Sequence, residues 1–218
     1  MVAAAAISGF ALLSAPAEER AVGSSLKGEA ALAAAASRGD KGSFGQLVDL
    51  HKRAVYGFCL RLTRNPEDAR DAAQETFARA YAALTTFDPG QRFLPWVLRI
   101  ARNHCLDLHR RLSLRPREVL LLAEENGGEK VEVADPKALR ADEVLERREL
   151  AGSLDRAVSA LPANYREVVE LFHVQHLSYK EIAETMNVPI GTVMSWLFRA
   201  RAHLREELEA SGAAEGRP

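Results

Sequence analysis

Apolar residues recur three and four positions apart along most of this chain, a spacing that predicts amphipathic helices with one buried face. The pattern predicts helices over residues 29–37, 44–62, 66–84 and 95–111. No segment alternates apolar and polar residues between turn signals, as a half-buried strand would. We therefore expect an all-α protein.

Breaker residues fix where these helices begin and end. Asn65 is a good N-cap, and Pro66 after it is tolerated at the first position of a helix. The Asp-Pro-Gly triplet at residues 88–90 requires a loop. Periodicity is lost over residues 113–140, which we interpret as a linker with one short helical piece near residues 119–124.

The last third of the chain has a pattern typical of a helix-turn-helix. Helical periodicity returns at Ala141 and again over residues 164–173. Ser178 and Glu181 then form a capping-box signature for a short helix. An Asn-Val-Pro triplet breaks this helix, and a long helix follows over residues 191–208. Its apolar seam consists of Val193, Leu197, Ala200 and Leu204.

The opposite face of this long helix is polar and basic, and it has no acidic residue before Glu206. Such a face suits a helix that enters the major groove of DNA. The alternative is a helical hairpin whose arginines are simply solvated. The residues on or beside this face are Thr192, Met194, Ser195, Phe198, Arg199, Arg201, Ala202 and Arg205.

The helix over residues 66–84 carries an acidic and amide face of Asp68, Asp71, Gln74 and Glu75. Acids in the first turn favour the helix dipole, which explains Asp68. The dipole explains Asp71 and Glu75 less well. A surface for a basic partner is the functional alternative, and the pattern alone leaves both open.

The helix over residues 95–111 carries a basic face instead. Arginine contacts phosphates and asparagine can bond a base edge, so this face suits DNA. A solvated arginine face is an equally good interpretation of the pattern. The residues of the face are Arg99, Arg102, Asn103, Leu106 and Arg110.

The distribution of charge bears on the function of these faces, because basic and acidic residues are segregated along the chain. The 218 residues have a formal net charge of −1, which excludes a protein that coats nucleic acid through bulk charge. Residues 99–117 contain six arginines against Asp107 alone, and residues 118–149 contain ten acids against five bases. Residues 189–205 contain three arginines and no acid. This order indicates two nucleic-acid faces joined by an acidic connector.

The sequence predicts no metal site, cofactor or catalytic residue. Cys59 and Cys105 lie in helical patterns and are expected to be reduced core residues. Cys105 with His104 and His109 would be an incomplete ligand set. Phosphate-loop and nucleophile-elbow motifs are absent from the sequence, so an enzyme has little support.

Residues 1–27 begin with an apolar run from Val2 to Leu13. No Lys or Arg precedes the run, and the run is too short to span a bilayer. We therefore expect a disordered extension, or an upstream start codon, rather than a targeting segment. The residues after Ala210 are expected to be frayed.

Two blocks of the sequence resemble the extracytoplasmic-function (ECF) sigma factors, compact members of the bacterial sigma-70 family. PEDARDAAQETFARAYAALTTFDPGQRFLPWVLRIARNHCLDLHRR resembles region two, and LPANYREVVELFHVQHLSYKEIAETMNVPIGTVMSWLFRARAHL resembles region four. Both blocks, in this order and at this spacing, are specific to the family. The resemblance implies two small helical domains, region two over residues 28–112 and region four over residues 141–210, joined by the linker over residues 113–140.

The resemblance also implies a function, namely binding core RNA polymerase and directing promoter-specific transcription initiation. Region two would grip the coiled-coil of the largest polymerase subunit and read the −10 element. Region four would dock on the polymerase flap and read the −35 element. The implied core-binding residues are Asp68, Asp71, Gln74 and Glu75.

The resemblance also implies residues that contact the promoter. For the −10 element these are Phe87 and Asp88, in a loop that captures a flipped base, together with Arg99, Arg102, Asn103, Arg110 and Arg111. The implied −35 residues are Thr192, Met194, Ser195, Arg199 and Arg201.

The chain departs from the family pattern at Met194 and Trp196, where relatives commonly carry basic residues. We expect fewer phosphate contacts and an unusual −35 preference as a result. The resemblance further implies a cytoplasmic protein, with a cognate anti-sigma factor that can hold it at the membrane, and no small-molecule substrate. The main alternative is a stand-alone helix-turn-helix regulator, which would not need the acidic and basic helices of residues 66–111. A helical scaffold would leave the charge segregation unexplained.

Overall fold

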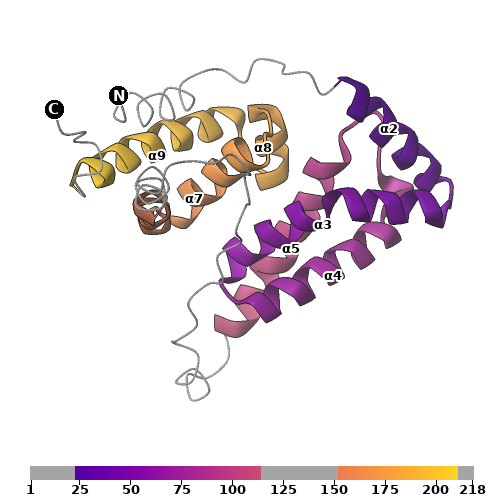
Figure 1. Ribbon diagram of the computed structural model, residues 1–218, viewed down its shortest axis with the longest axis horizontal. Coiled ribbons are helices and arrows are strands. Elements are labelled where there is room, and N and C mark those ends of the chain that lie inside the picture. The colour runs from indigo at the N-terminus through magenta and orange to yellow at the C-terminus, as the bar shows by residue number, and fades with distance from the viewer. Residues whose placement is uncertain (1–22, 114–151, 211–218) are drawn as a thin grey trace, which may run out of the picture. The chain divides into compact units, whose positions relative to one another are not determined.

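The computed structural model describes residues 23–113 and 152–210, and every regular element in these ranges is a helix (Figure 1). The chain divides into two compact units. One contains helices α2 to α5, and the other contains most of the chain after residue 151. We call them the N-terminal and C-terminal units. The all-α prediction is confirmed for the described residues.

The N-terminal unit contains four α-helices and one short 3-10 turn. These elements are α2 (Gly23–Ser37), α3 (Lys41–Thr63), α4 (Pro66–Ala82), the turn η1 (Leu84–Thr86) and α5 (Phe93–Ser113). Helices α3, α4 and α5 pack against one another in pairs, and α2 packs on α3 and reaches both η1 and α5 (Figure 1). The two faces predicted to carry function therefore belong to neighbouring helices, α4 and α5.

Local signals set the boundary between α3 and α4 as the sequence predicts. Arg64 ends α3 in the left-handed conformation, with a φ of 56°. The side-chain oxygen of Asn65 then accepts hydrogen bonds from the backbone N–H groups of Glu67, at 2.8 Å, and Asp68, at 3.2 Å. Pro66 stands at the start of α4. Two of the amides that a helix start leaves unpaired are thus satisfied by the cap.

The core of the N-terminal unit consists of apolar side chains from its amphipathic helices. Each large side chain that is fully buried contributes about 2 kcal/mol relative to exposure. The buried side chains include Leu47, Val55, Phe58, Cys59, Phe93, Val97 and Leu98.

Two boundaries differ from the prediction. Helix α2 begins at Gly23, inside the predicted extension over residues 1–27. Helix α5 begins at Phe93, two residues before Pro95. The remainder of that extension, most of the linker, and the predicted helical piece near residues 119–124 lie outside the described residues.

The C-terminal unit contains the predicted helix-turn-helix. Residues 152–160 are helical. Helix α7 (Ala163–Val169) continues into a π-helical turn, η3 (Glu170–Val174), which the periodicity did not predict. Helices α8 (Tyr179–Met186) and α9 (Ile190–Ala210) follow.

The capping box of α8 is confirmed in both directions. The backbone N–H of Ser178 donates to the Glu181 carboxylate at 2.8 Å, and the Glu181 N–H donates to the Ser178 hydroxyl at 3.3 Å. Asn187 then ends α8 with a φ of 54°. The predicted seam of α9 is buried, namely Val193, Leu197, Ala200 and Leu204. The polar face of α9 is therefore oriented away from the core of its own unit.

Candidate nucleic-acid and partner interfaces

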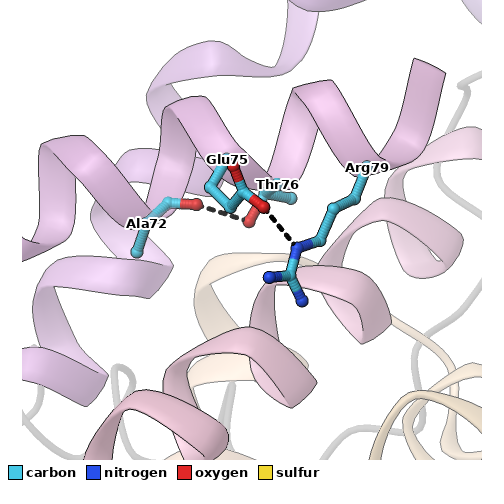
Figure 2. Close-up of polar contacts among 4 residues, drawn as sticks. All are labelled: Ala72, Glu75, Thr76 and Arg79. Carbon is cyan, nitrogen blue, oxygen red and sulfur yellow. Dashed lines mark hydrogen bonds and ion pairs between the residues drawn. The ribbon is translucent and has the colours of Figure 1, made fainter. Parts of the chain in front are cut away.

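The acidic face of α4 is accessible. Asp71, Gln74 and Glu75 are exposed, and Asp68 near the helix start is half-buried. Opposite this face, Thr76 is fully buried, and its hydroxyl donates to the Ala72 carbonyl at 2.6 Å (Figure 2). The buried side fixes the rotation of α4, so the carboxylates point to solvent.

One carboxylate of this face is compensated and another is not. The Arg79 guanidinium donates to the Glu75 carboxylate at 2.7 Å, one helical turn along (Figure 2). This hydrogen bond holds the pKa of Glu75 below its usual value. Asp71 has no ion pair within the described part of the chain. Asp71 therefore presents a less compensated charge than Glu75.

The basic face of α5 is exposed for most of its length. Arg99, Asn103 and Arg111 are exposed, and Arg102 and Leu106 are half-buried. Arg110 is also exposed and lies 3.8 Å from Asp107, a solvent-exposed pair that adds little stability. Arginines flanking an asparagine on one helix face supply phosphate donors around one group that can bond a base edge.

His104 connects the two charged faces, and sequence reasoning considered it only as a metal ligand. Partial burial lowers the pKa of His104, and the positive charge of Arg79 on α4 lowers it further. The carboxylates of Glu75 and Asp107 act in the opposite direction. The packing of α5 against α4 creates this position, and no local sequence signal marks it.

The loop between η1 and α5 exposes its acid and buries its aromatic residue. Asp88 is exposed, and its carboxylate accepts the Gly90 N–H at 2.9 Å. Phe87 is only 5% exposed, and its ring centroid lies 4.9 Å from Trp96 and 5.7 Å from Phe93. The Phe87 ring is therefore packed in the core of its unit, and the contact of Phe87 with DNA stays a prediction.

The outer face of α9 presents most of the residues assigned to it. Met194, Ser195 and Arg199 are exposed, and Thr192 is half-buried. The Ser195 hydroxyl donates to the Gly191 carbonyl at 2.9 Å, one turn earlier. The hydroxyl oxygen can still accept a hydrogen bond from a ligand, because it has two lone pairs.

Arg201, beside this face, is half-buried. Its guanidinium carbon lies 5.8 Å from the ring centroid of Phe172, a cation–π distance. Two of its nitrogen atoms, Nε and one terminal nitrogen, are buried without a hydrogen-bond partner. The Arg201 side chain therefore packs partly on Phe172, and its contact with DNA stays a prediction.

An apolar row accompanies the polar residues of α9. Ile190, Met194 and Phe198 lie four residues apart and are 50%, 53% and 74% exposed. Met194 was flagged by its departure from the family pattern, but only the structure shows that it continues a row. The outer face of α9 therefore combines polar, basic and apolar groups.

The described residues contain no group of three or more His, Cys, Asp or Glu that could hold a metal ion. Cys59 and Cys105 are buried free thiols. Among the described helices, none is long and apolar enough to cross a membrane.

Comparison with known proteins identifies both units. The chain matches the family models for sigma-70 region 2, over residues 47–115, and sigma-70 region 4, over residues 151–204. It is 34% identical over 175 residues to the ECF RNA polymerase sigma factor SigW of Bacillus subtilis, covering 78% of this chain and 91% of SigW. It is 32% identical over 177 residues to the ECF RNA polymerase sigma-E factor of Escherichia coli, covering 79% of this chain and 90% of that protein.

Two solved structures are similar to most of this chain. CnrH in complex with the cytosolic domain of CnrY is 28% identical, with a TM-score of 0.58, covering 84% of this chain and 98% of CnrH. The sigma factor RpoE in complex with the anti-sigma factor NepR, from Bartonella quintana, is 26% identical with the same TM-score of 0.58. That match covers 76% of this chain and 96% of RpoE.

Proposed function

Because the chain belongs to the ECF sigma factors of the sigma-70 family, we propose that it binds core RNA polymerase through α4 and reads promoter DNA through α5 and α9. The main support for this proposal is that α4 and α5 pack against each other and expose faces of opposite charge. One domain can therefore engage a basic protein surface and DNA at the same time. This activity is binding and positioning, with no reaction assigned to the chain itself.

The acidic face of α4 is the proposed polymerase surface. Asp68, Asp71, Gln74 and Glu75 would contact the coiled-coil of the largest subunit. Charge complementarity across such an interface speeds association and selects the partner more than it adds affinity. The second unit would dock on the polymerase flap.

The basic face of α5 is the proposed −10 surface. Asn103 would read a base edge, and Arg99, Arg102, Arg110 and Arg111 would hold the backbone. Asp88, in the exposed loop before α5, would contact the base that is flipped out on melting. Phe87 anchors the start of this loop, because its ring packs against Phe93 and Trp96.

The outer face of α9 is the proposed −35 surface. Thr192, Met194, Ser195 and Arg199 would face the major groove, where a helix fits and base edges are distinguishable. We further propose that the protein acts in the cytoplasm and is controlled by a cognate anti-sigma factor. Control by an anti-sigma factor is supported by the similar sigma factor RpoE, whose solved structure is a complex with the anti-sigma factor NepR.

Binding to purified core RNA polymerase tests this proposal. The wild-type chain is expected to bind stoichiometrically. The double variant Asp71→Arg, Glu75→Arg is expected to bind at least about tenfold more weakly, because each reversal replaces an attraction with a repulsion. A matched double reversal of exposed acids off this face, Asp49→Arg with Asp155→Arg, controls for the change in net charge.

Equal binding by both double variants would show that α4 is not the polymerase surface. Failure of the wild-type chain to bind core, together with tight dimeric binding to duplex DNA alone, would instead establish the stand-alone regulator.

A further inference from the structure

The loop before α5 is held at both of its ends by one aromatic cluster. Phe87 precedes residues 88–92, which are exposed or half-buried, and Phe93 follows them, with ring centroids 5.7 Å apart. Both rings also contact Trp96, at 4.9 Å and 5.5 Å. The loop therefore leaves the core and returns to it at nearly the same place.

The return point is also capped from a distant part of the chain. Helix α5 begins at Phe93 and has no acidic residue in its first turn. The carboxylate of Glu29, on α2, accepts the Phe93 N–H at 3.0 Å across 64 residues of sequence. A carboxylate at this position satisfies one unpaired amide and complements the positive end of the helix dipole.

His51 on α3 completes the arrangement. Its Nε2 lies 3.5 Å from the same Glu29 oxygen, an ion-pair distance without the geometry of a hydrogen bond, and its ring stacks on Phe93 at 5.6 Å. The Glu29 and His51 side chains are only 14% and 11% exposed. One carboxylate thus joins α2, α3 and the start of α5.

The environment keeps Glu29 ionised despite its burial. Burial acts to raise its pKa, but the nearby His51 imidazole, the hydrogen bond from the Phe93 N–H and the charge of Arg92 together hold the pKa below the usual value. A cavity of about 200 Å³ beside this cap is lined by α2, including Ala30 and Ala33, and by residues 89–93 of the loop. Helix α2 therefore forms the wall behind the loop.

We propose that Glu29 is a positioning residue for promoter opening, whose cap holds the 88–92 loop and the start of α5 ready to receive the base extruded from the −10 element. The inference rests on the proposed −10 role of α5 and its loop. Without an acceptor at residue 29, the Phe93 N–H loses its partner and the loop samples more conformations. Base capture must then also order the loop, which costs affinity.

The test measures how holoenzyme binds a single-stranded −10 oligonucleotide, using a sequence selected with that holoenzyme. An abasic site is moved along the oligonucleotide, and the captured base is the one whose removal weakens wild-type binding most. Glu29→Met keeps length and packing but has no acceptor, whereas Glu29→Gln retains an acceptor oxygen. Asp49→Asn is the control, an exposed acid on α3.

We expect Glu29→Met to bind the intact oligonucleotide about fivefold more weakly, because the ordering that the cap supplies, worth a factor of about that size in helix stability, must then come from binding. The loss of affinity on removing the captured base is expected to be smaller in Glu29→Met by a similar factor. The effect of the substitution and the effect of the abasic site are coupled, because both act on capture of the same base. Glu29→Gln should retain most of the wild-type loss. Core binding and binding of −35 duplex should stay at the wild-type level.

If Glu29→Met binds core as the wild type does and also loses as much affinity as the wild type when the captured base is removed, the positioning role is overturned. If Glu29→Met binds core poorly, Glu29→Ser with the same readout decides between the two results, because its shorter side chain cannot reach Phe93. No abasic penalty at any position for the wild-type holoenzyme would contradict the proposed −10 role itself, which is a different failure.

Discussion

At the scale of single residues, Asp71 and Glu75 lie one turn apart on α4 but differ in their surroundings. Arg79 donates to Glu75 at 2.7 Å, and no described residue forms an ion pair with Asp71. A helical wheel treats the two carboxylates as equivalent. Only the side-chain geometry shows that one of them is already partly neutralised.

This difference predicts unequal effects of removing each charge. Asp71→Asn is expected to weaken core binding by about 1 kcal/mol, roughly fivefold, and Glu75→Gln by less than half of that. Titration of labelled core polymerase with each variant measures both. In an Arg79→Ala background, Glu75→Gln should weaken core binding more than it does in the wild type. Without Arg79, the Glu75 carboxylate is not compensated before it is removed. A larger loss for Glu75→Gln than for Asp71→Asn contradicts this account.

Met194 permits a second prediction at this scale. It is 53% exposed on the face of α9 proposed to meet DNA, and it carries no charge. Met194→Arg should raise promoter affinity and steepen its salt dependence by close to one unit of slope, because one more phosphate is neutralised. Ser159→Arg adds the same charge to an exposed site on another helix and should change neither quantity. Unchanged affinity and slope in Met194→Arg would show that residue 194 does not approach the backbone.

Two of the residues assigned to DNA contact share a feature that the sequence does not reveal. Phe87 and Arg201 occupy positions that pattern and resemblance place near DNA, but both side chains turn toward aromatic neighbours. A long arginine side chain can lie along its helix and cover apolar surface, so the position of its Cα does not determine where its charged group lies. The sequence contains no local signal for that choice.

At the scale of elements, caps and breakers were predictable because they are local. The Asn65 cap and the Ser178–Glu181 box each involve residues within one turn, so spacing reveals them. The start of α5 was wrong by two residues because its cap comes from Glu29, 64 residues away. The π-helical turn after α7 was not predicted, because its buried Glu170 is polar and pairs at 3.0 Å with Gln175, the residue that follows the turn.

The same turn gives a pH-dependent prediction for the C-terminal unit. Burial lowers the pKa of His173 to about 4, with further contributions from Arg201 and His176, against a usual value of 6.5. Folded His173 is therefore neutral where the unfolded residue would take a proton. Stability of the unit should fall as pH drops from about 6.5 to 4, by about 1 kcal/mol after allowance for partial solvent screening.

Thermal unfolding of the full chain at pH 7 and pH 5 measures this effect. His173→Gln should lose less stability on acidification than the wild type, whereas His109→Gln, at an exposed site on α5, should behave as the wild type does. An identical acid-induced loss in wild type and His173→Gln would mean that His173 is protonated in the fold.

At the scale of the whole molecule, charge is segregated within a chain of net charge −1. The acidic face of α4, the basic face of α5 and the outer face of α9 are separate surfaces on two units. Low net charge weakens sequence-independent binding to DNA, so delivery by a partner can dominate. This organisation could be predicted from sequence because charge blocks and helical periodicity are both linear patterns, whereas the distant contacts that shape each surface are not.

The central claim is that this chain gives core RNA polymerase specificity for a promoter read at two places. Transcription by core polymerase with the purified chain, from a library of random upstream sequences, tests it most directly. The account predicts that productive templates share two short elements at one fixed separation. Variants at Asn103 should relax the element nearer the start site, and variants at Arg199 the farther one. Productive templates that share a single palindromic element, or transcription no different from that of core alone, would contradict the account.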